Sequence, residues 1–211
     1  MKIGILGSGD VGRALAKAFK SEGHSVTIAT RDLHSPKAGE LKELGVKVDT
    51  FANTAKFADV AVLCTLWTAT EEAIKLIEPA NLAGKVVIDV TNPLDTSQGM
   101  PPSLALSGND SGGEQVQRWL KDSLVVKAFN SVGNEQMYKP SFGNVTPTMF
   151  YCGNDAGAKE IVKTIILEFG WEPLDVGDIT SSRELEALCI LWVKAGMASG
   201  NWANAFKLLS K

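Results

Sequence analysis

Short apolar runs alternate with amphipathic segments along most of the 211-residue chain. Runs rich in Val and Ile predict buried strands, and apolar residues at helical spacing predict helices. The predicted strands cover residues 2–6, 25–30, 59–65, 85–91, 123–130 and 147–153, with a shorter one near 172–176. The predicted helices cover residues 10–22, 36–45, 67–77, 155–169 and 180–210.

The order of these segments predicts an α/β fold. Strands that are apolar almost throughout are buried on both faces, which is typical of a parallel sheet with helices on each side. We therefore expect a doubly wound, mostly parallel sheet formed by residues 1–153. Residues 154–211 are expected to form a small, largely helical C-terminal part packed on that sheet.

Two segments outside this alternation suggest further features. Residues 95–113 are rich in Gly, Ser, Pro and Asp, which predicts a mobile loop without regular structure and a candidate lid. The closing helix is expected to carry an apolar stripe that Trp202 and Phe206 extend. The stripe comprises Leu185, Leu188, Leu191, Trp192 and Ala195. It predicts a homodimer, with packing on the chain's own sheet as the alternative.

Composition narrows the class of partner. A net charge of −3 gives no large attraction to nucleic acid or anionic membranes, and no apolar run reaches the roughly 18 to 20 residues needed to cross a bilayer. Three widely spaced cysteines are typical of reduced thiols in a cytoplasmic protein. Two histidines are too few for a metal cluster, so we expect a cytoplasmic protein that acts on small molecules.

A glycine-rich turn follows the first predicted strand. The stretch GILGSGDVG has G-x-G-x-x-G spacing and opens the first predicted helix. In such a turn the first glycine permits a tight bend, the second lets the backbone approach a pyrophosphate, and the third allows the helix to pack closely on the strand. The N–H groups at the helix start then meet the phosphates. We therefore expect a Rossmann-type domain that binds a dinucleotide through Gly7, Ser8, Gly9, Asp10, Val11 and Gly12.

The end of the second predicted strand indicates which dinucleotide binds. NAD-binding chains carry an acid about 20 residues after the glycine turn, whereas this chain has Thr30 and Arg31 there. A carboxylate would repel a 2′-phosphate, but Thr30 can donate a hydrogen bond to it and Arg31 can pair with its charge and stack on adenine. We therefore predict NADP(H). In the alternative interpretation Arg31 is a solvated cation and Asp32 holds the ribose.

Ligands of open parallel sheets bind beyond the carboxyl ends of the strands. The residues expected to line the site at these ends are Thr65, Leu66, Trp67, Asn92, Pro93 and Asn130. The first three would wall the middle of the cofactor, although Trp67 can equally be the first buried residue of its helix. Asn92 and Asn130 offer amides that can orient a nicotinamide or a flat acceptor. Each can instead be a turn residue that bonds to its own backbone.

The sequence contains no evident set of residues for acid–base catalysis. His24 and His34 lie away from the predicted strand ends, and Asp89 lies inside a predicted strand, where we expect it to be buried and paired in a structural role. Hydride transfer between two ring cofactors needs alignment more than a protein acid, because the cofactors carry the chemistry. We therefore assign no catalytic residue and no metal ligand.

Several segments resemble a known family. GILGSGDVGRALA, TNP, VVKAFN, CGN and SRELEAL resemble the NADP oxidoreductases that depend on the deazaflavin coenzyme F420. They are also similar to the cytosolic oxidoreductase domain of STEAP-type metalloreductases, which use NADPH and a flavin. The resemblance spans essentially the whole chain. It implies an often dimeric Rossmann protein in which Leu66 is a cofactor position and the nicotinamide lies near Asn92, Pro93, Asn130 and Val132.

Together these features predict an NADP(H)-dependent oxidoreductase. It would pass hydride directly between NADPH and a small-molecule redox acceptor, either F420 or a flavin such as FMN or FAD. Three alternatives stay open: an enzyme of the hydroxyacid dehydrogenase or imine reductase type, an NADP(H)-binding sensor without turnover, and a structural dimerisation module. Hydroxyacid dehydrogenases and imine reductases generally need a larger helical domain. A screen of acceptors would distinguish a sensor from an enzyme. The intact glycine turn argues against a purely structural module.

Overall fold

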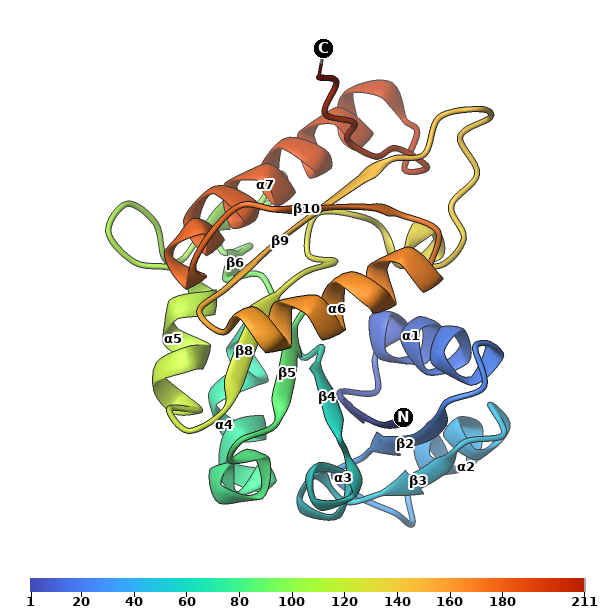
Figure 1. The fold of residues 1–211 in the computed structure, drawn as a ribbon. Coiled ribbons are helices and arrows are strands. Elements are labelled where there is room, and N and C mark those ends of the chain that lie inside the picture. Colours follow the sequence, from blue (N-terminus) through green and yellow to red (C-terminus); the bar gives the residue numbers. More distant parts are fainter. Residues whose placement is uncertain (211) are drawn as a thin grey trace.

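A computed structural model describes residues 1–210 and contains one eight-stranded sheet with helices on both faces (Figure 1). The strands of this sheet are β1 (Lys2–Leu6), β2 (Ser25–Ala29), β3 (Lys47–Asp49), β4 (Val60–Leu63), β5 (Val86–Asp89), β8 (Leu124–Lys127), β9 (Thr148–Gly153) and β10 (Glu172–Asp175). The helices are α1 (Asp10–Ser21), α2 (Pro36–Lys42), α3 (Phe51–Phe57), α4 (Trp67–Ile77), α5 (Gly112–Trp119), α6 (Ala156–Glu168) and α7 (Ser182–Ser199). Within the described residues no helix is both long and apolar enough to span a membrane.

The strand order confirms the predicted doubly wound sheet. It runs β10-β9-β8-β5-β4-β1-β2-β3, and the six strands from β8 to β3 are parallel. The direction of the strand order reverses between β1 and β4. On one side β1 is followed by β2 and β3, and on the other side β4 is followed by β5 and β8. In open sheets of this kind the ligand crevice lies at that reversal, beyond the carboxyl ends of the strands.

Burial on both faces explains the near-continuous apolar runs. One face packs against α1 and α6, with Phe19 of α1 and Ile165 of α6 completely buried. The other face packs against α3, α4 and α5, where Ala55, Ile74 and Val116 are buried. A strand between two helix layers has little use for polar side chains, so any charge inside one needs a partner.

The C-terminal part stands beyond the carboxyl ends of the parallel strands. β9 runs antiparallel to β8 and shares with it only the pairs Val126–Gly153 and Lys127–Cys152. The earlier residues of β9 therefore extend past the end of β8, and β10 pairs in parallel with that extension. Figure 1 shows α7 lying along β9 and β10 on this side of the molecule.

The prediction of a helix through residue 210 is wrong. α7 ends at Ser199, because Gly200 adopts a left-handed conformation with φ of 68°, which is a common end of helices. The described part of the tail, residues 200–210, then folds back. Trp202 packs on Trp192 with ring centroids 5.4 Å apart, and the carbonyl oxygen of Phe206 accepts a hydrogen bond from the N–H of Thr148 at 2.9 Å.

The predicted stripe on α7 divides between two environments. The residues buried against the chain's own structure are Ser182, Leu185, Glu186, Cys189, Val193 and Gly196. Leu188 and Trp192 are half-buried, and Leu191 and Ala195 are exposed. Only Leu185 of the predicted stripe therefore belongs to the core, and the dimer stays a prediction.

The expectation that residues 95–113 lack regular structure holds for most of this segment, but short elements interrupt it. A short antiparallel hairpin, β6 (Leu94–Asp95) and β7 (Ser103–Leu104), closes the base of this segment, and α5 begins at Gly112. The N–H of Ala105 also donates to the carbonyl oxygen of Pro93 at 2.7 Å. The segment is therefore anchored at both ends, and its tip is residues 96–102.

Candidate functional site

The carboxyl ends of five neighbouring parallel strands bring the predicted site residues into one row. In spatial order the row contains Thr30 and Arg31 after β2, Gly7–Gly12 after β1, Thr65–Trp67 after β4, Asn92 and Pro93 after β5, and Asn130–Val132 after β8. Neighbouring strands are about 4.8 Å apart, so the row spans about 19 Å. A dinucleotide lying along this row in the predicted direction would have its adenosine at Arg31 and its nicotinamide at Asn130.

The glycine turn is tightly packed at both ends and open at its centre. Gly7 has φ of +145°, and a Cβ atom there would lie 2.5 Å from the carbonyl oxygen of Cys64. A Cβ atom at Gly12 would overlap the carbonyl oxygen of Gly7. At Gly9, by contrast, a Cβ atom would meet no described atom within 4 Å. The protein's own packing therefore demands glycine at positions 7 and 12, whereas the space over Gly9 is open to a ligand.

The two helices that start in the row lack a side-chain cap, as α7 does elsewhere, whereas the other four helices have one. The starts of α2, α3, α5 and α6 are capped by the side chains of Ser35, Thr50, Ser111 and Asp155. α1 and α4 have Gly9 and Leu66 at their N-cap positions, and neither forms a side-chain cap to the described residues. The N–H groups of the first turn of α1 can therefore bind an anion. Leu66 is 80% exposed beside it and offers an apolar surface.

At the end of β2 the structure separates the two residues predicted to bind a 2′-phosphate. Thr30 is buried, and its hydroxyl donates to the carbonyl oxygen of Asp32 at 3.3 Å. Arg31 is exposed. The Asp32 carboxylate accepts a hydrogen bond from the N–H of His34 at 2.8 Å, which stabilises the turn before α2. Arg31 is therefore better placed than Thr30 to meet a ligand here.

The residues after β4 pack partly on neighbouring helices. The hydroxyls of Thr65 and Thr70 lie 2.9 Å apart. Trp67 stacks on Trp119 of α5, with centroids 5.7 Å apart and an interplanar angle of 28°. Trp67 is half-buried, so it is a packing residue of α4 that keeps some exposed surface at the strand end.

Asn92 and Asn130 bind each other rather than their own turns. Asn92 Nδ2 donates to the carbonyl oxygen of Asn130 at 2.7 Å, and Asn130 Nδ2 donates to Asn92 Oδ1 at 2.9 Å and to the carbonyl oxygen of Leu185 at 2.8 Å. The Asn130 amide is thereby fixed in orientation, and its Oδ1 has no donor among the described residues. A buried acceptor without a donor is costly, so this oxygen is a candidate to accept a hydrogen bond from a ligand. Val132 is buried in the core and presents little side chain to the row.

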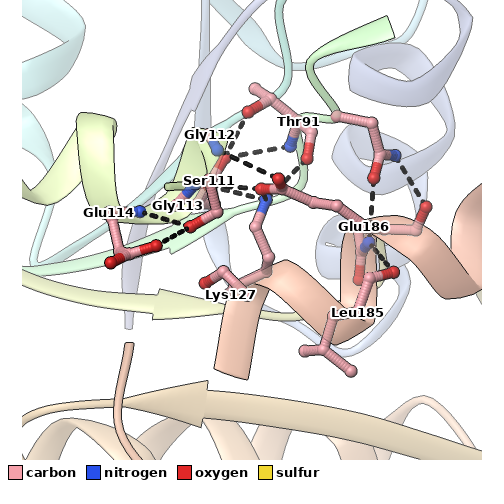
Figure 2. A network of polar contacts seen from close by, with 12 residues as sticks. Thr91, Ser111, Gly112, Gly113, Glu114, Lys127, Leu185 and Glu186 are labelled. Carbon is pink, nitrogen blue, oxygen red and sulfur yellow. Dashed lines mark hydrogen bonds and ion pairs between the residues drawn. The ribbon is translucent and has the colours of Figure 1, made fainter. Parts of the chain in front are cut away.

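A buried charged group lies directly beneath this end of the row. Lys127 Nζ lies 2.9 Å from Asp89 Oδ2 and 3.0 Å from Glu186 Oε1, and it donates to the carbonyl oxygen of Thr91 at 2.7 Å. Figure 2 shows the Lys127 ammonium between Thr91 and Glu186. We call Lys127, Asp89 and Glu186 the Lys127 network. The expectation that Asp89 is buried and paired is confirmed.

The Lys127 network ties four segments together. The Glu186 carboxylate accepts hydrogen bonds from the N–H groups of Gly112 and Gly113, at 3.0 and 2.9 Å, and so caps the start of α5 from α7. Burial lowers the pKa of Lys127, but the charges of Asp89 and Glu186 outweigh burial and hold that pKa above its ordinary value. The ammonium is therefore retained inside the protein.

Sequence reasoning missed Lys127 and Glu186 as parts of the site. A signal existed, because VVID and VVKAF each place one charge in an otherwise apolar strand, and opposite charges in adjacent strands predict a pair. Nothing local identifies Glu186, which stands in a helix where glutamate is ordinary.

The described cysteines are free and buried. Burial raises the pKa of Cys64 to about 12 and those of Cys152 and Cys189 to about 11. These groups remain thiols near neutral pH, so they act as packing residues.

Comparison with known proteins gives one family. Residues 2–93 match the family model of NADP oxidoreductase, coenzyme F420-dependent. The chain is 33% identical over 209 residues to the F420-dependent NADP reductase of Methanocaldococcus jannaschii, which covers 92% of this chain and 91% of the relative. It is 32% identical over 191 residues to Metalloreductase STEAP3 of Rattus norvegicus, but this match spans only 36% of the metalloreductase.

Solved structures agree with this result. A protein from Arthrobacter sp. FB24, proposed to be an F420-dependent NADP reductase, is 38% identical with a TM-score of 0.94 over 100% of both chains. The imine reductase of a Pseudomonas species has a TM-score of 0.70 at 16% identity, covering 94% of this chain and 63% of that one, and so shares the fold. The predicted resemblance is confirmed over the length of the chain, which belongs to the family of coenzyme F420-dependent NADP oxidoreductases.

Proposed function

We propose that this NADP-dependent oxidoreductase binds NADPH along the row of strand ends and passes hydride directly to coenzyme F420. The observation that carries the proposal is the Asn92–Asn130 pair at the end of the row opposite Arg31. The orientation of the Asn130 amide leaves its Oδ1 as an acceptor. The carboxamide of a nicotinamide supplies an N–H donor of the kind that this oxygen needs.

The residues around this pair support direct transfer. The strand ends supply amide, hydroxyl and apolar groups, which can align two flat rings, and a bound ring cofactor supplies the hydride chemistry. On this proposal, the glycine turn and the start of α1 hold the pyrophosphate and Arg31 meets the 2′-phosphate. The acceptor ring would lie over the nicotinamide, beside the anchored segment 95–113.

Coverage of the relatives favours F420 over a flavin. The relative that matches over 91% of its own length is named an F420-dependent NADP reductase. The metalloreductase match spans 36% of that protein. This chain therefore shares a larger part of the F420-dependent reductase than of the metalloreductase, including more of the sequence that could form an acceptor site.

The test is a parallel screen of acceptors. NADPH oxidation is followed with F420, FMN, FAD, a ferric chelate and a cyclic imine, at equal protein concentration. Turnover that is fastest with F420 supports the proposal. Faster turnover with FMN or FAD identifies a flavin acceptor, turnover of the imine identifies an imine reductase, and NADPH binding without any turnover identifies a sensor.

We also propose that two copies pair through α7. Leu191 is 54% and Met197 43% exposed on this helix, and Trp202 of the adjoining tail is 47% exposed. Exposed apolar surface of this kind usually marks an interface. Light scattering is expected to give about 45 kDa, twice the 22.5 kDa chain mass. Leu191→Lys should lower that mass, whereas Leu167→Lys, a matched change at an exposed leucine of α6, should not.

A further inference from the structure

The contacts of the Lys127 network determine its charge. Asp89 Oδ1 accepts hydrogen bonds from the N–H and the hydroxyl of Thr91, at 2.9 and 2.7 Å, and Oδ2 faces the Lys127 ammonium. Glu186 meets two N–H groups and the same ammonium. A protonated carboxyl group needs an acceptor for its O–H, and these contacts are donors. These contacts suit two carboxylates, and two carboxylates with one ammonium carry a net charge of −1.

This excess charge lies next to the end of the row that would hold the nicotinamide. A Cβ atom built on Gly112 would be 3.0 Å from Glu186 Oε1 and 3.2 Å from both Pro93 Cδ and the Trp67 ring, so Glu186 lies close to these two predicted cofactor positions. On the other side, Leu185, the neighbour of Glu186, accepts the hydrogen bond from Asn130. The side chains of Asp89 and Glu186 are 0% and 1% exposed, so water screens their charge little.

We propose that the Lys127 network stabilises the oxidised cofactor over the reduced one through its excess negative charge. The nicotinamide ring is cationic in NADP⁺ and neutral in NADPH, so a fixed anion at its base favours NADP⁺ selectively. Asp89 and Glu186 act here as positioning residues with an electrostatic effect and touch neither substrate. The inference rests on the proposed function in one respect, because it needs the nicotinamide beside Asn92 and Asn130. Its consequence is a protein biased toward giving up hydride.

The test compares the affinities of NADP⁺ and NADPH by calorimetric titration. Glu186→Gln and Asp89→Asn each remove one negative charge at nearly constant volume. In each variant the ratio of the NADP⁺ Kd to the NADPH Kd should rise about three- to tenfold, as expected for one charge acting across several ångströms of protein. Glu184→Gln, at an exposed position of the same helix, is the matched control and should leave the ratio unchanged.

Each outcome decides the proposal. A constant ratio in folded Glu186→Gln or Asp89→Asn, or an equal loss of affinity for both nucleotides, shows a purely structural network and overturns it. If circular dichroism shows that neither variant folds, the unmodified protein decides, and tighter binding of NADPH than of NADP⁺ overturns the inference. A protein that shows the shift in ratio but reduces no acceptor contradicts the proposed function and leaves this inference standing. A protein that binds neither nucleotide contradicts both.

Discussion

The two ends of the candidate site are built in opposite ways. At the glycine turn the backbone makes the surface, and the centre of the turn is open above Gly9. At the Lys127 network side chains from β5, β8 and α7 make the structure, and the charged atoms are sealed from solvent. The first end is ready to meet charge brought by a ligand, and the second already contains its own charge.

Because of this difference, changes at the glycine turn should affect ligand binding, and changes in the Lys127 network should affect stability. A change at the open centre of the glycine turn removes space that only a ligand needs. A change in the Lys127 network leaves a buried charge without its partner, which destabilises the fold itself.

The largest expected effect is at Gly9. Gly9→Val fills the space where backbone would approach a pyrophosphate, so NADPH binding should weaken by about a thousandfold, or ~4 kcal/mol, with unchanged circular dichroism. Gly12→Val is the contrast, because its side chain would overlap the Gly7 carbonyl oxygen and lower the stability of the protein itself. Calorimetric titration and thermal unfolding of both variants are the measurements. Normal NADPH binding by Gly9→Val would show that the turn holds no phosphate.

Lys127→Met should destabilise the protein by about 3 to 5 kcal/mol, since it leaves the Asp89 and Glu186 carboxylates buried without their cation. Urea unfolding measures the loss. Lys194→Met changes an exposed lysine of α7 and should alter stability little. Similar stabilities for the two variants would mean that the buried network contributes no more than a surface charge.

Replacing Thr30 by Asp together with Arg31 by Ala should remove roughly 2 to 4 kcal/mol of preference for NADPH over NADH, because the charge-assisted contact to the 2′-phosphate is lost. Since Thr30 is buried, Arg31→Ala alone should account for most of this loss. Both nucleotides are titrated against each variant. Lys37→Ala, a nearby exposed cation, is the control. Equal affinities of the unmodified protein for NADPH and NADH would refute the role of this strand end.

The smallest effect concerns Arg183, which binds Glu114 through two hydrogen bonds at 2.8 and 2.6 Å and so joins α7 to α5. Hydrogen bonding to Arg183 holds the pKa of Glu114 below its ordinary value of 4.5. The stabilisation is therefore complete above that value and disappears as pH falls through the lower, folded-state pKa. Arg183→Met should cost about 1 kcal/mol near neutral pH and nearly nothing in strong acid. A cost that stays constant with pH would exclude this ion pair as its source.

Local sequence was enough to predict the sheet and the glycine turn. Both depend on residues that are neighbours in the chain, either an apolar run or three glycines at fixed spacing. β3 and α3 were not predicted, because each is short and the β3 sequence KVD contains only one apolar residue. The predicted C-terminal helix was too long, because the apolar pattern continues past Gly200, where the helix ends.

The order of the candidate site residues was also predictable from local sequence. The strand ends follow one another along the row as the topology dictates, so the places of Arg31, Gly9 and Asn92 in the row could be predicted. The mutual bonding of Asn92 and Asn130, and the capping of α5 by Glu186, depend on contacts between residues far apart in sequence. Spacing carries no information on such contacts until the fold has placed them.

The Lys127 network also has a consequence for how the protein is made. Synthesis proceeds from the N-terminus, and domains generally begin to fold as they emerge from the ribosome. Lys127 and Asp89 are therefore translated well before Glu186, which α7 supplies near the end of the chain. A nascent chain that contains β8 but not yet α7 has only one of the two carboxylates for its ammonium and no cap on Gly112 and Gly113. The end of the row that would face the nicotinamide is therefore completed only after α7 has been synthesised.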